Sequence, residues 1–489
     1  MRFALSLSIL TISLVGGWWS LPLHAQAAPG PTPPVPAAEI DVATLARIRD
    51  AAMASDYAYQ RLADLSDKIG PRLSGSAGAE AAVAYVAAAM KAEGLTVSLQ
   101  PVKVPHWVRG LETGELVDYA GRPAGVTQHL QLTALGGSAA TPAKGLTAPV
   151  LLVRSVAELR ERAAEARGRI VLISAPFNQN YADNGQAGQA YREAGEPRFI
   201  GPSVAAQAGA RAALVRSVGG ANYRLAHAGT TRWSDGVAPI PAAALTAEDA
   251  MLIERLAAQG PVSLKLVLTP QTLPDADSHN VLADLPGREK PDEVVIVSGH
   301  LDSWDLGTGA MDDGMGVAAA MGAVQVLKSL GLAPRRSVRM VAWMNEENGG
   351  RGGKAYFDAV KDRIATQSAA IESDFGLAGP LGFSASISEA QAKRLAPVGQ
   401  VLRAIGAGVV DTVAGDVGAD IAPLQAAGVP GIAPLVDGRH YFDLHHTAAD
   451  TFDKIDPQAL RRQTAVLAVL AYALADLPEP LERAPTAPR

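Results

Sequence analysis

The residues best suited to chemistry lie in four segments of the second half of the chain. Residues 294–297 read VVIV, the pattern of a buried strand, and lead into SGHLDSWDLGTGAMDDG at 298–314. VRMVAWMNEEN at 338–348 and AAIESD at 369–374 repeat this order, with acids directly after an apolar run. The fourth segment, HYFDLHHTAADT at 440–451, carries a histidine pair. Because α/β sheets collect their ligands at the carboxyl ends of strands, we expect these side chains to converge.

A set of two imidazoles and three carboxylates follows from these segments. Such a set suits two divalent cations that share one carboxylate, and zinc is the favoured metal. Without metal, five converging titratable groups would be strongly destabilising, because like charges repel and buried charge must be paired. Read singly, each residue could instead be a solvated or structural side chain. The set is His300, Asp312, Glu347, Asp374 and His446.

Composition limits the classes of function. The 489 residues are 48% hydrophobic, enough for a large core and two or more domains. The net charge is −6 and no run of lysine or arginine occurs, so a nucleic-acid partner is not expected. The chain has no cysteine, which excludes disulfides, a thiol nucleophile and a cysteine-ligated zinc site.

The N-terminus has the pattern of an export signal. Arg2 precedes a mostly apolar stretch, and Ala25-Gln26-Ala27 offers small residues for cleavage. We therefore expect a signal peptide at 1–27, a Pro/Ala-rich leader at 28–40, and a periplasmic or secreted protein of a bacterial envelope with no membrane contact after cleavage. An uncleaved membrane anchor is the alternative.

The remaining chain divides into three stretches. Residues 41–135 begin with helical patterning, whereas 136–272 alternate short β-like runs with small helices. Residues 273–489 alternate strands and helices in the α/β manner. The middle stretch therefore looks inserted into a domain formed by the other two. Its polar, aromatic-containing parts at 177–199 and 223–233 are candidates to overhang the site, and Trp304 and Tyr441 either line a pocket or pack.

With these motifs in view, the chain resembles the M28 metallopeptidases, in particular their carboxypeptidase Q branch. The resemblance covers nearly all of the mature chain and rests on SGHLDSWDLGTGAMDDGMGV, NEEN, ESD, HHTAADT, PRLSGS and GADIAPLQAAGVPGI. The middle stretch resembles a protease-associated domain through RIVLI, AAQAGARAALV and PIPAAALTAEDA. The resemblance implies a three-layer α/β/α peptidase domain with a mixed central sheet, interrupted by an inserted protease-associated-like domain.

The resemblance also assigns ligand roles for two Zn²⁺ ions. It implies that His300 and Asp374 hold one ion, that Glu347 and His446 hold the other, and that Asp312 bridges them. The family places its histidine ligand directly before Thr or Ser, which selects His446; its neighbour His445 remains the alternative.

Three further acids receive roles from the same resemblance. Glu346 matches the general base. Asp302 matches the carboxylate that fixes the ligand imidazole of His300 through its other nitrogen. Asp313 follows the bridging aspartate at a peptide bond that the family holds in cis.

The function implied is that of an exopeptidase that hydrolyses the N-terminal peptide bond of unblocked dipeptides or short peptides. Metal-activated water and the base Glu346 would carry the reaction. A carboxypeptidase of the same family and a non-catalytic binding protein on this fold are the alternatives. A one-zinc, glutaminyl-cyclase-like acyltransferase fits less well with the adjacent Glu346-Glu347 pair. The carboxypeptidase Q branch forms dimers, which leaves a homodimer open.

Overall fold

The computed structural model describes residues 40–220 and 223–483. The expected signal peptide at 1–27 and the leader up to residue 39 therefore lie outside the described residues. Within the described ranges, no helix combines the length and the apolar character needed to cross a membrane. The described residues belong to one compact unit.

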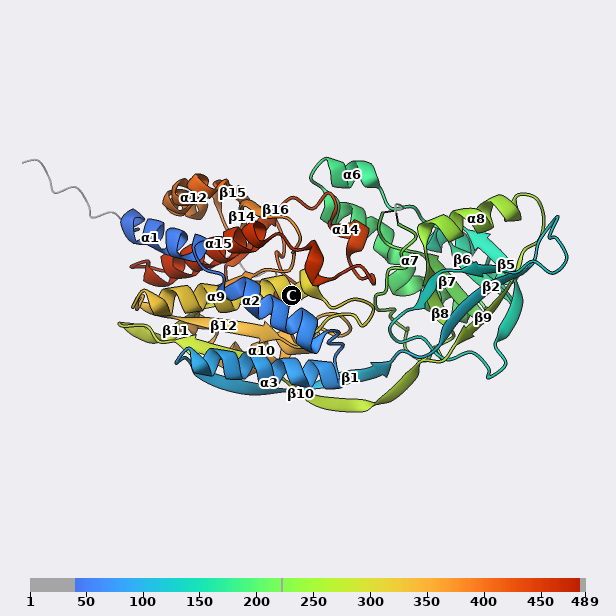
Figure 1. Ribbon diagram of the computed structural model, residues 1–489, viewed down its shortest axis with the longest axis horizontal. Coiled ribbons are helices and arrows are strands. Elements are labelled where there is room, and N and C mark those ends of the chain that lie inside the picture. Colours follow the sequence, from blue (N-terminus) through green and yellow to red (C-terminus); the bar gives the residue numbers. More distant parts are fainter. Residues whose placement is uncertain (1–39, 221–222, 484–489) are drawn as a thin grey trace, which may run out of the picture. The chain divides into compact units, whose positions relative to one another are not determined.

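The first sheet holds the segments singled out by their chemistry. Among the described residues it has eight strands in the order β1-β10-β12-β11-β13-β16-β14-β15 (Figure 1). The central strands β12, β11, β13 and β16 run parallel, whereas β10 is antiparallel to β1 and β12, and β14 is antiparallel to β16. The strands are β1 (Thr96–Val108), β10 (Gln271–Leu285), β11 (Lys290–His300), β12 (Arg336–Trp343), β13 (Gln367–Glu372), β14 (Pro380–Ser386), β15 (Val409–Thr412) and β16 (Gly431–Val436).

Helices cover both faces of this sheet, because its central strands are apolar on both sides. Val295 and Val297 of β11 pack into the core with α9 and α15, whereas Val294 and Ile296 pack on the opposite face with α10 and α13. Figure 1 shows α9 running alongside β11 and β12. The helices are α1 (Val42–Met53), α2 (Tyr57–Ala63), α3 (Ala77–Ala92), α9 (Met315–Ser329), α10 (Arg351–Val360), α11 (Glu389–Arg394), α12 (Ala396–Leu402), α13 (Ala422–Ala426), α14 (Tyr441–Leu444) and α15 (Pro457–Asp476), with short turns η1 (Asp64–Ile69), η2 (Ala310–Gly314), η3 (Lys361–Thr366), η4 (Arg403–Ile405) and η5 (Phe452–Lys454).

Local sequence explains where the predicted helices begin and end. Ser76 caps α3 by accepting a hydrogen bond from the amide of Ala79, and Gly94 follows the helix with a φ of +75°, which glycine adopts readily. Asp456 caps α15, and Pro457 occupies the first turn, where its missing N–H has no helical acceptor.

A second sheet is built from residues 112–268. Within the described ranges its eight strands follow the order β3-β2-β9-β5-β6-β7-β8-β4, with β5, β6, β7 and β8 parallel. Its strands are β2 (Glu112–Asp118), β3 (Gln128–Leu130), β4 (Leu132–Ala134), β5 (Leu146–Val153), β6 (Ile170–Ile173), β7 (Ala212–Arg216), β8 (Ala242–Leu245) and β9 (Ser263–Leu268), and its helices are α4 (Val156–Glu161), α5 (Ala163–Ala166), α6 (Gln179–Asp183), α7 (Ala187–Gln207) and α8 (Ala247–Ala257).

The mixed α/β architecture predicted from the sequence is confirmed, with helices on both faces of a mixed sheet. The chain enters the second sheet at Glu112, earlier than the expected boundary at residue 136, because β2 pairs with β9 and β4 with β8. The sequence of these early strands does not alternate between strand and helix patterns, so it gave no sign that the second sheet begins there. The division into a peptidase domain and an inserted domain stays a prediction.

Candidate active site

Three of the four segments that carry the candidate site residues follow strands that end at one edge of the first sheet. In the parallel register, His300 at the end of β11 pairs with Trp343 at the end of β12, and Ser298 pairs with Glu372 at the end of β13. The acids that follow β12 and β13 therefore meet the histidine that ends β11. The expected convergence is confirmed.

Asp312 lies between the two predicted histidine ligands. Its Oδ1 atom lies 3.1 Å from Nε2 of His300, and its Oδ2 atom lies 3.2 Å from Nε2 of His446. Nε2 of His300 also lies 3.1 Å from Oδ1 of Asp374, and Nε2 of His446 lies 2.9 Å from Oε2 of Glu347. The structure thus brings all five predicted residues together as two groups that share Asp312.

The neighbouring Asp313 fixes the turn that carries Asp312. The Asp312–Asp313 peptide bond is cis, as the family resemblance implied. The Asp313 carboxylate accepts hydrogen bonds from the backbone amides of His300 and Gly316, each at 3.0 Å. A Cβ atom on Gly316 would lie 2.1 Å from the Ser373 carbonyl oxygen, so glycine is needed for α9 to begin this close to β13.

Both histidines are oriented through their Nδ1 atoms. Nδ1 of His300 lies 2.9 Å from the carbonyl oxygen of Asp302, and Nδ1 of His446 lies 3.2 Å from that of Ala228. The amide of Ala228 also donates to the His446 carbonyl at 2.8 Å. A carbonyl acceptor at Nδ1 places the proton there and leaves Nε2 free to bind a metal ion.

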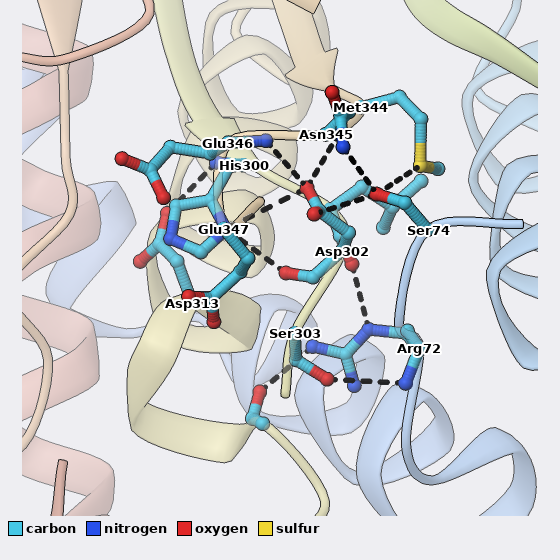
Figure 2. A network of polar contacts seen from close by, with 12 residues as sticks. Arg72, Ser74, His300, Asp302, Ser303, Asp313, Met344, Asn345, Glu346 and Glu347 are labelled. Carbon is cyan, nitrogen blue, oxygen red and sulfur yellow. Dashed lines mark hydrogen bonds and ion pairs between the residues drawn. The ribbon is translucent and has the colours of Figure 1, made fainter. Parts of the chain in front are cut away.

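The role expected of the Asp302 carboxylate differs from the contacts observed. The carboxylate lies 4.0 Å from Nδ1 of His300, and the backbone carbonyl of Asp302 makes the hydrogen bond in its place. Oδ1 instead accepts from the amides of Asn345 at 2.7 Å and Glu346 at 3.0 Å (Figure 2). The Ser74 hydroxyl donates to the other oxygen, Oδ2. These three donors from other segments hold the carboxylate away from the His300 imidazole.

His445 shares part of the ligand geometry of His446. Its Nε2 atom lies 3.3 Å from Oδ2 of Asp312, and the two imidazole rings are stacked with centroids 3.5 Å apart. Asp312, His445 and His446 could together hold an ion. However, the contacts to Glu347 and to the orienting carbonyl of Ala228 belong to His446, which favours it as the ligand.

The electrostatics of the site call for added positive charge. Burial, together with the like charge of Asp312, raises the pKa of Glu347 to about 7, and burial also raises the pKa of Asp374. Although burial opposes it, the carboxylates of Asp374 and Asp312 raise the pKa of His300 well above its usual value. Asp312 Oδ2 is buried without a hydrogen bond in the described part of the chain. Divalent cations between these donors would offset the repulsion, so the residues present fit a metal site.

A cavity of about 710 Å³ opens onto the two groups. Its wall includes Glu346 and all the predicted ligands except His300. Tyr191, Arg198 and Phe199 of α7 and Thr231 between β7 and β8 form another part of the wall, so both stretches expected to overhang the site contribute to it. Tyr441 also lines this cavity.

Comparison with known proteins agrees with this geometry. The family model described as Peptidase family M28 matches residues 280–471, which include every predicted site residue. Human carboxypeptidase Q is 39% identical over 432 residues, covering 88% of each chain. The chain belongs to peptidase family M28. It is therefore an enzyme, a metallopeptidase.

Solved structures of relatives have the same architecture. A peptidase M28 precursor from Shewanella amazonensis is 33% identical, with a TM-score of 0.84 over 92% of this chain and 99% of that one. A zinc aminopeptidase from Bacillus subtilis is 21% identical, with a TM-score of 0.61 over 87% of this chain and 98% of that one, and shares the fold.

Some functional groups of this M28 peptidase were not found by sequence reasoning. Ala228 acts through its backbone carbonyl, which leaves no residue-type signal. Arg198, buried in the cavity wall, lies in the stretch 177–199 that was expected to overhang the site, but the residue itself was given no role. Ser74 lies in the PRLSGS motif, which was noted for its resemblance but given no role. Trp304 was an open choice, and it packs into the core of the second sheet.

Proposed function

We propose that this M28 peptidase binds two zinc ions and hydrolyses the N-terminal peptide bond of unblocked dipeptides or short peptides. One observation carries the proposal: Asp312 lies between two groups that each pair a histidine with a carboxylate. Asp312 and Glu346 both line the same cavity.

The chain's own donors divide into two sets of ligands. His300 and Asp374 would hold one ion and Glu347 and His446 the other, with one oxygen of Asp312 directed to each. Nitrogen and oxygen donors of this kind suit zinc. When bound, zinc lowers the proton affinity of water and polarises a carbonyl oxygen.

Glu346 would move the proton. Its side chain lines the cavity, and burial, reinforced by the like charges of Asp374 and Glu347, raises its pKa well above the usual value. A carboxylate with a raised pKa accepts a proton from the attacking water more readily, and can then donate it to the leaving amine.

The two ends of a dipeptide would meet opposite charges. The carboxylates of the ligand set form the acidic wall, which suits a free α-amino group. Arg198 of α7 lines the same cavity with 2% of its surface exposed, and among the described residues it has no carboxylate partner. Its guanidinium lies over the rings of Tyr191 and Phe199, at 5.1 and 4.6 Å. A buried cation without a counter-ion suits the terminal carboxylate of a short substrate.

Three substrates of matched sequence test this proposal. We expect the free dipeptide to be cleaved with a kcat/KM far above that of its N-acetyl form, and the C-terminal amide to lose part of the rate. Equal kcat/KM values for the free and acetylated forms would mean that the amino group is not read.

A tripeptide separates the two exopeptidase classes. In a dipeptide the N-terminal and C-terminal bonds are the same bond, so an aminopeptidase and a carboxypeptidase give the same products. Release of the first residue of a tripeptide supports the proposal, whereas release of the last residue would establish a carboxypeptidase.

Replacing Glu346 tests the chemistry. Glu346→Gln removes a proton acceptor without removing a ligand, so zinc should stay bound while kcat falls by roughly 10²–10⁴-fold. Activity within a few-fold of the unchanged enzyme would contradict the assignment of the base.

We also propose export to the periplasm or the medium. The support is the sequence pattern of residues 1–27, with its apolar stretch and small-residue cleavage site. Mass spectrometry of the N-terminus of the expressed protein tests it: a mature chain that begins near Ala28 is expected, and an intact Met1 would contradict cleavage.

A further inference from the structure

We propose that Ser74 is a positioning residue for Glu346 and acts through Asp302. This inference rests on the proposed function, because it takes Glu346 as the base. Ser74 lies between α2 and α3, far along the chain from both acids, and it forms no part of the cavity wall described above.

The Ser74 hydroxyl joins two segments that meet behind the base. It donates to Oδ2 of Asp302 at 2.9 Å and accepts from Nδ2 of Asn345 at 3.1 Å. Figure 2 shows it beside the Asp302 carboxylate, with Asn345 and Met344 above it. Ser74, Asp302 and Asn345 are at most 1% exposed, so water does not compete for these hydrogen bonds.

Asp302 passes this constraint to the base through two backbone amides. Its Oδ1 atom accepts from the amides of Asn345 and Glu346, while the Ser74 hydroxyl is the hydrogen-bond donor to Oδ2 among the described residues. With both oxygens bonded, the carboxylate plane is fixed and so is the turn that carries Glu346. Without the hydroxyl, Oδ2 would be a buried, unsatisfied oxygen, and the carboxylate would gain from rotating toward Nδ1 of His300.

The backbone of the turn shows why such support matters. Asn345 has a φ of +76°, in the left-handed region that costs a non-glycine residue free energy. Its side chain also donates to Asn348, so the Ser74 contact is part of what holds Asn345 in this conformation. Loosening the turn would misplace Glu346, whereas the α7 part of the cavity wall and Glu347, which the Trp304 amide and His446 hold, would stay in place.

The PRLSGS motif supplies a matched control. Ser76 lies two residues from Ser74, but its side chain accepts from the Ala79 amide at 3.1 Å and caps α3. Ser74→Ala should lower kcat by roughly 10–100-fold, the range typical of partners that orient active-site ligands, with KM within about 2-fold and zinc content unchanged. Ser76→Ala should lower the Tm through the lost cap and leave kcat unchanged.

Rescue and a parallel variant decide between the outcomes. Ser74→Thr keeps the hydroxyl and should recover most of kcat. Kinetics with a free dipeptide, zinc analysis and Tm would be measured for all four proteins and for Glu346→Gln. A Ser74→Ala enzyme with unchanged kcat, or one that loses kcat only in proportion to zinc or Tm, overturns the inference. If Glu346→Gln is nearly as active as the unchanged enzyme, the proposed base itself is wrong. If Glu346→Gln is inactive but Ser74→Ala is fully active, the base stands and only the role of Ser74 is wrong.

Discussion

The two halves of the candidate metal site are held in different ways. In the half around His300, the orienting carbonyl belongs to Asp302, two residues along the chain, and Asp374 follows the adjacent parallel strand. In the half around His446, the orienting carbonyl belongs to Ala228, 218 residues away, in the segment between β7 and β8 of the second sheet. The first half is therefore local to the first sheet, whereas the second half depends on a separate sheet.

The half around His446 also contains a residue with an unfavourable backbone conformation. His446 has a φ of +63°, a conformation that costs a β-carbon-bearing residue of order 1–3 kcal/mol. The backbone N–H and C=O of Ala228 both bond to His446. The amide of Gly220 also donates to the Phe442 carbonyl at 3.1 Å. Gly220 and Ala228 thus hold the loop that carries His446, the candidate ligand of this half.

The largest effect is expected where the two halves meet. Asp312→Ala removes the carboxylate shared by both groups and leaves His300 and His446 without their common neighbour. We expect zinc to be lost from both halves, with affinity falling by more than the roughly 10–100-fold typical of outer partners, and activity falling with it. Metal analysis after dialysis checks this; two retained ions would show that Asp312 is no bridge.

The histidine pair tests whether the second half depends on His446. His446→Ala should reduce zinc content from near two toward one per chain and remove most of the activity. His445→Ala should leave zinc content near two, because the contacts to Glu347 and Ala228 belong to His446. The reverse pattern in metal analysis would assign the ligand to His445.

The contrast between the halves also explains what the sequence could predict. The half around His300 follows from apolar runs that end in acids, since parallel strands in register bring such residues to one edge. The convergence of the five candidate ligands and the mixed sheet were predicted in this way or from the family resemblance. The Ala228 contact could not be predicted, because any residue type supplies a carbonyl oxygen. The direction of the Asp302 carboxylate depends on amides and a hydroxyl from distant segments, which no local pattern encodes.

A change in the second sheet should weaken one half selectively. A Cβ atom on Gly219 would lie 2.2 Å from Cε1 of His227 and 2.2 Å from the Phe442 carbonyl oxygen. Gly219→Ala must therefore push residue 219 away from His227 and from the Phe442 carbonyl, next to the His446 loop. We expect zinc content to fall toward one per chain while the ion held by His300 and Asp374 stays.

Gly260→Ala is the matched control for that change. Its Cβ atom would lie 3.4 Å from that of Ala120, an ordinary contact in the same part of the chain. It should leave zinc content and kcat unchanged. Equal zinc content in the Gly219 and Gly260 variants would show that the second sheet does not hold the His446 half.

The smallest effect is expected at Trp304, which links the His446 half to the core of the second sheet. Its backbone amide donates to Oε1 of Glu347 at 3.1 Å, while its ring is buried in the core of the second sheet and its Nε1 atom has no hydrogen-bond partner among the described residues. Trp304→Phe keeps the amide and an aromatic ring and removes an unsatisfied N–H. The loss in the free energy of unfolding should be about 1–2 kcal/mol, below the roughly 3–5 kcal/mol of deleting a whole aromatic side chain. Because the ring packs and does not line the main cavity, KM for a dipeptide should stay within about 2-fold while denaturant unfolding shows the loss. A large rise in KM with unchanged stability would mean that Trp304 contacts the substrate, and that the second sheet shapes the pocket as well as the metal site.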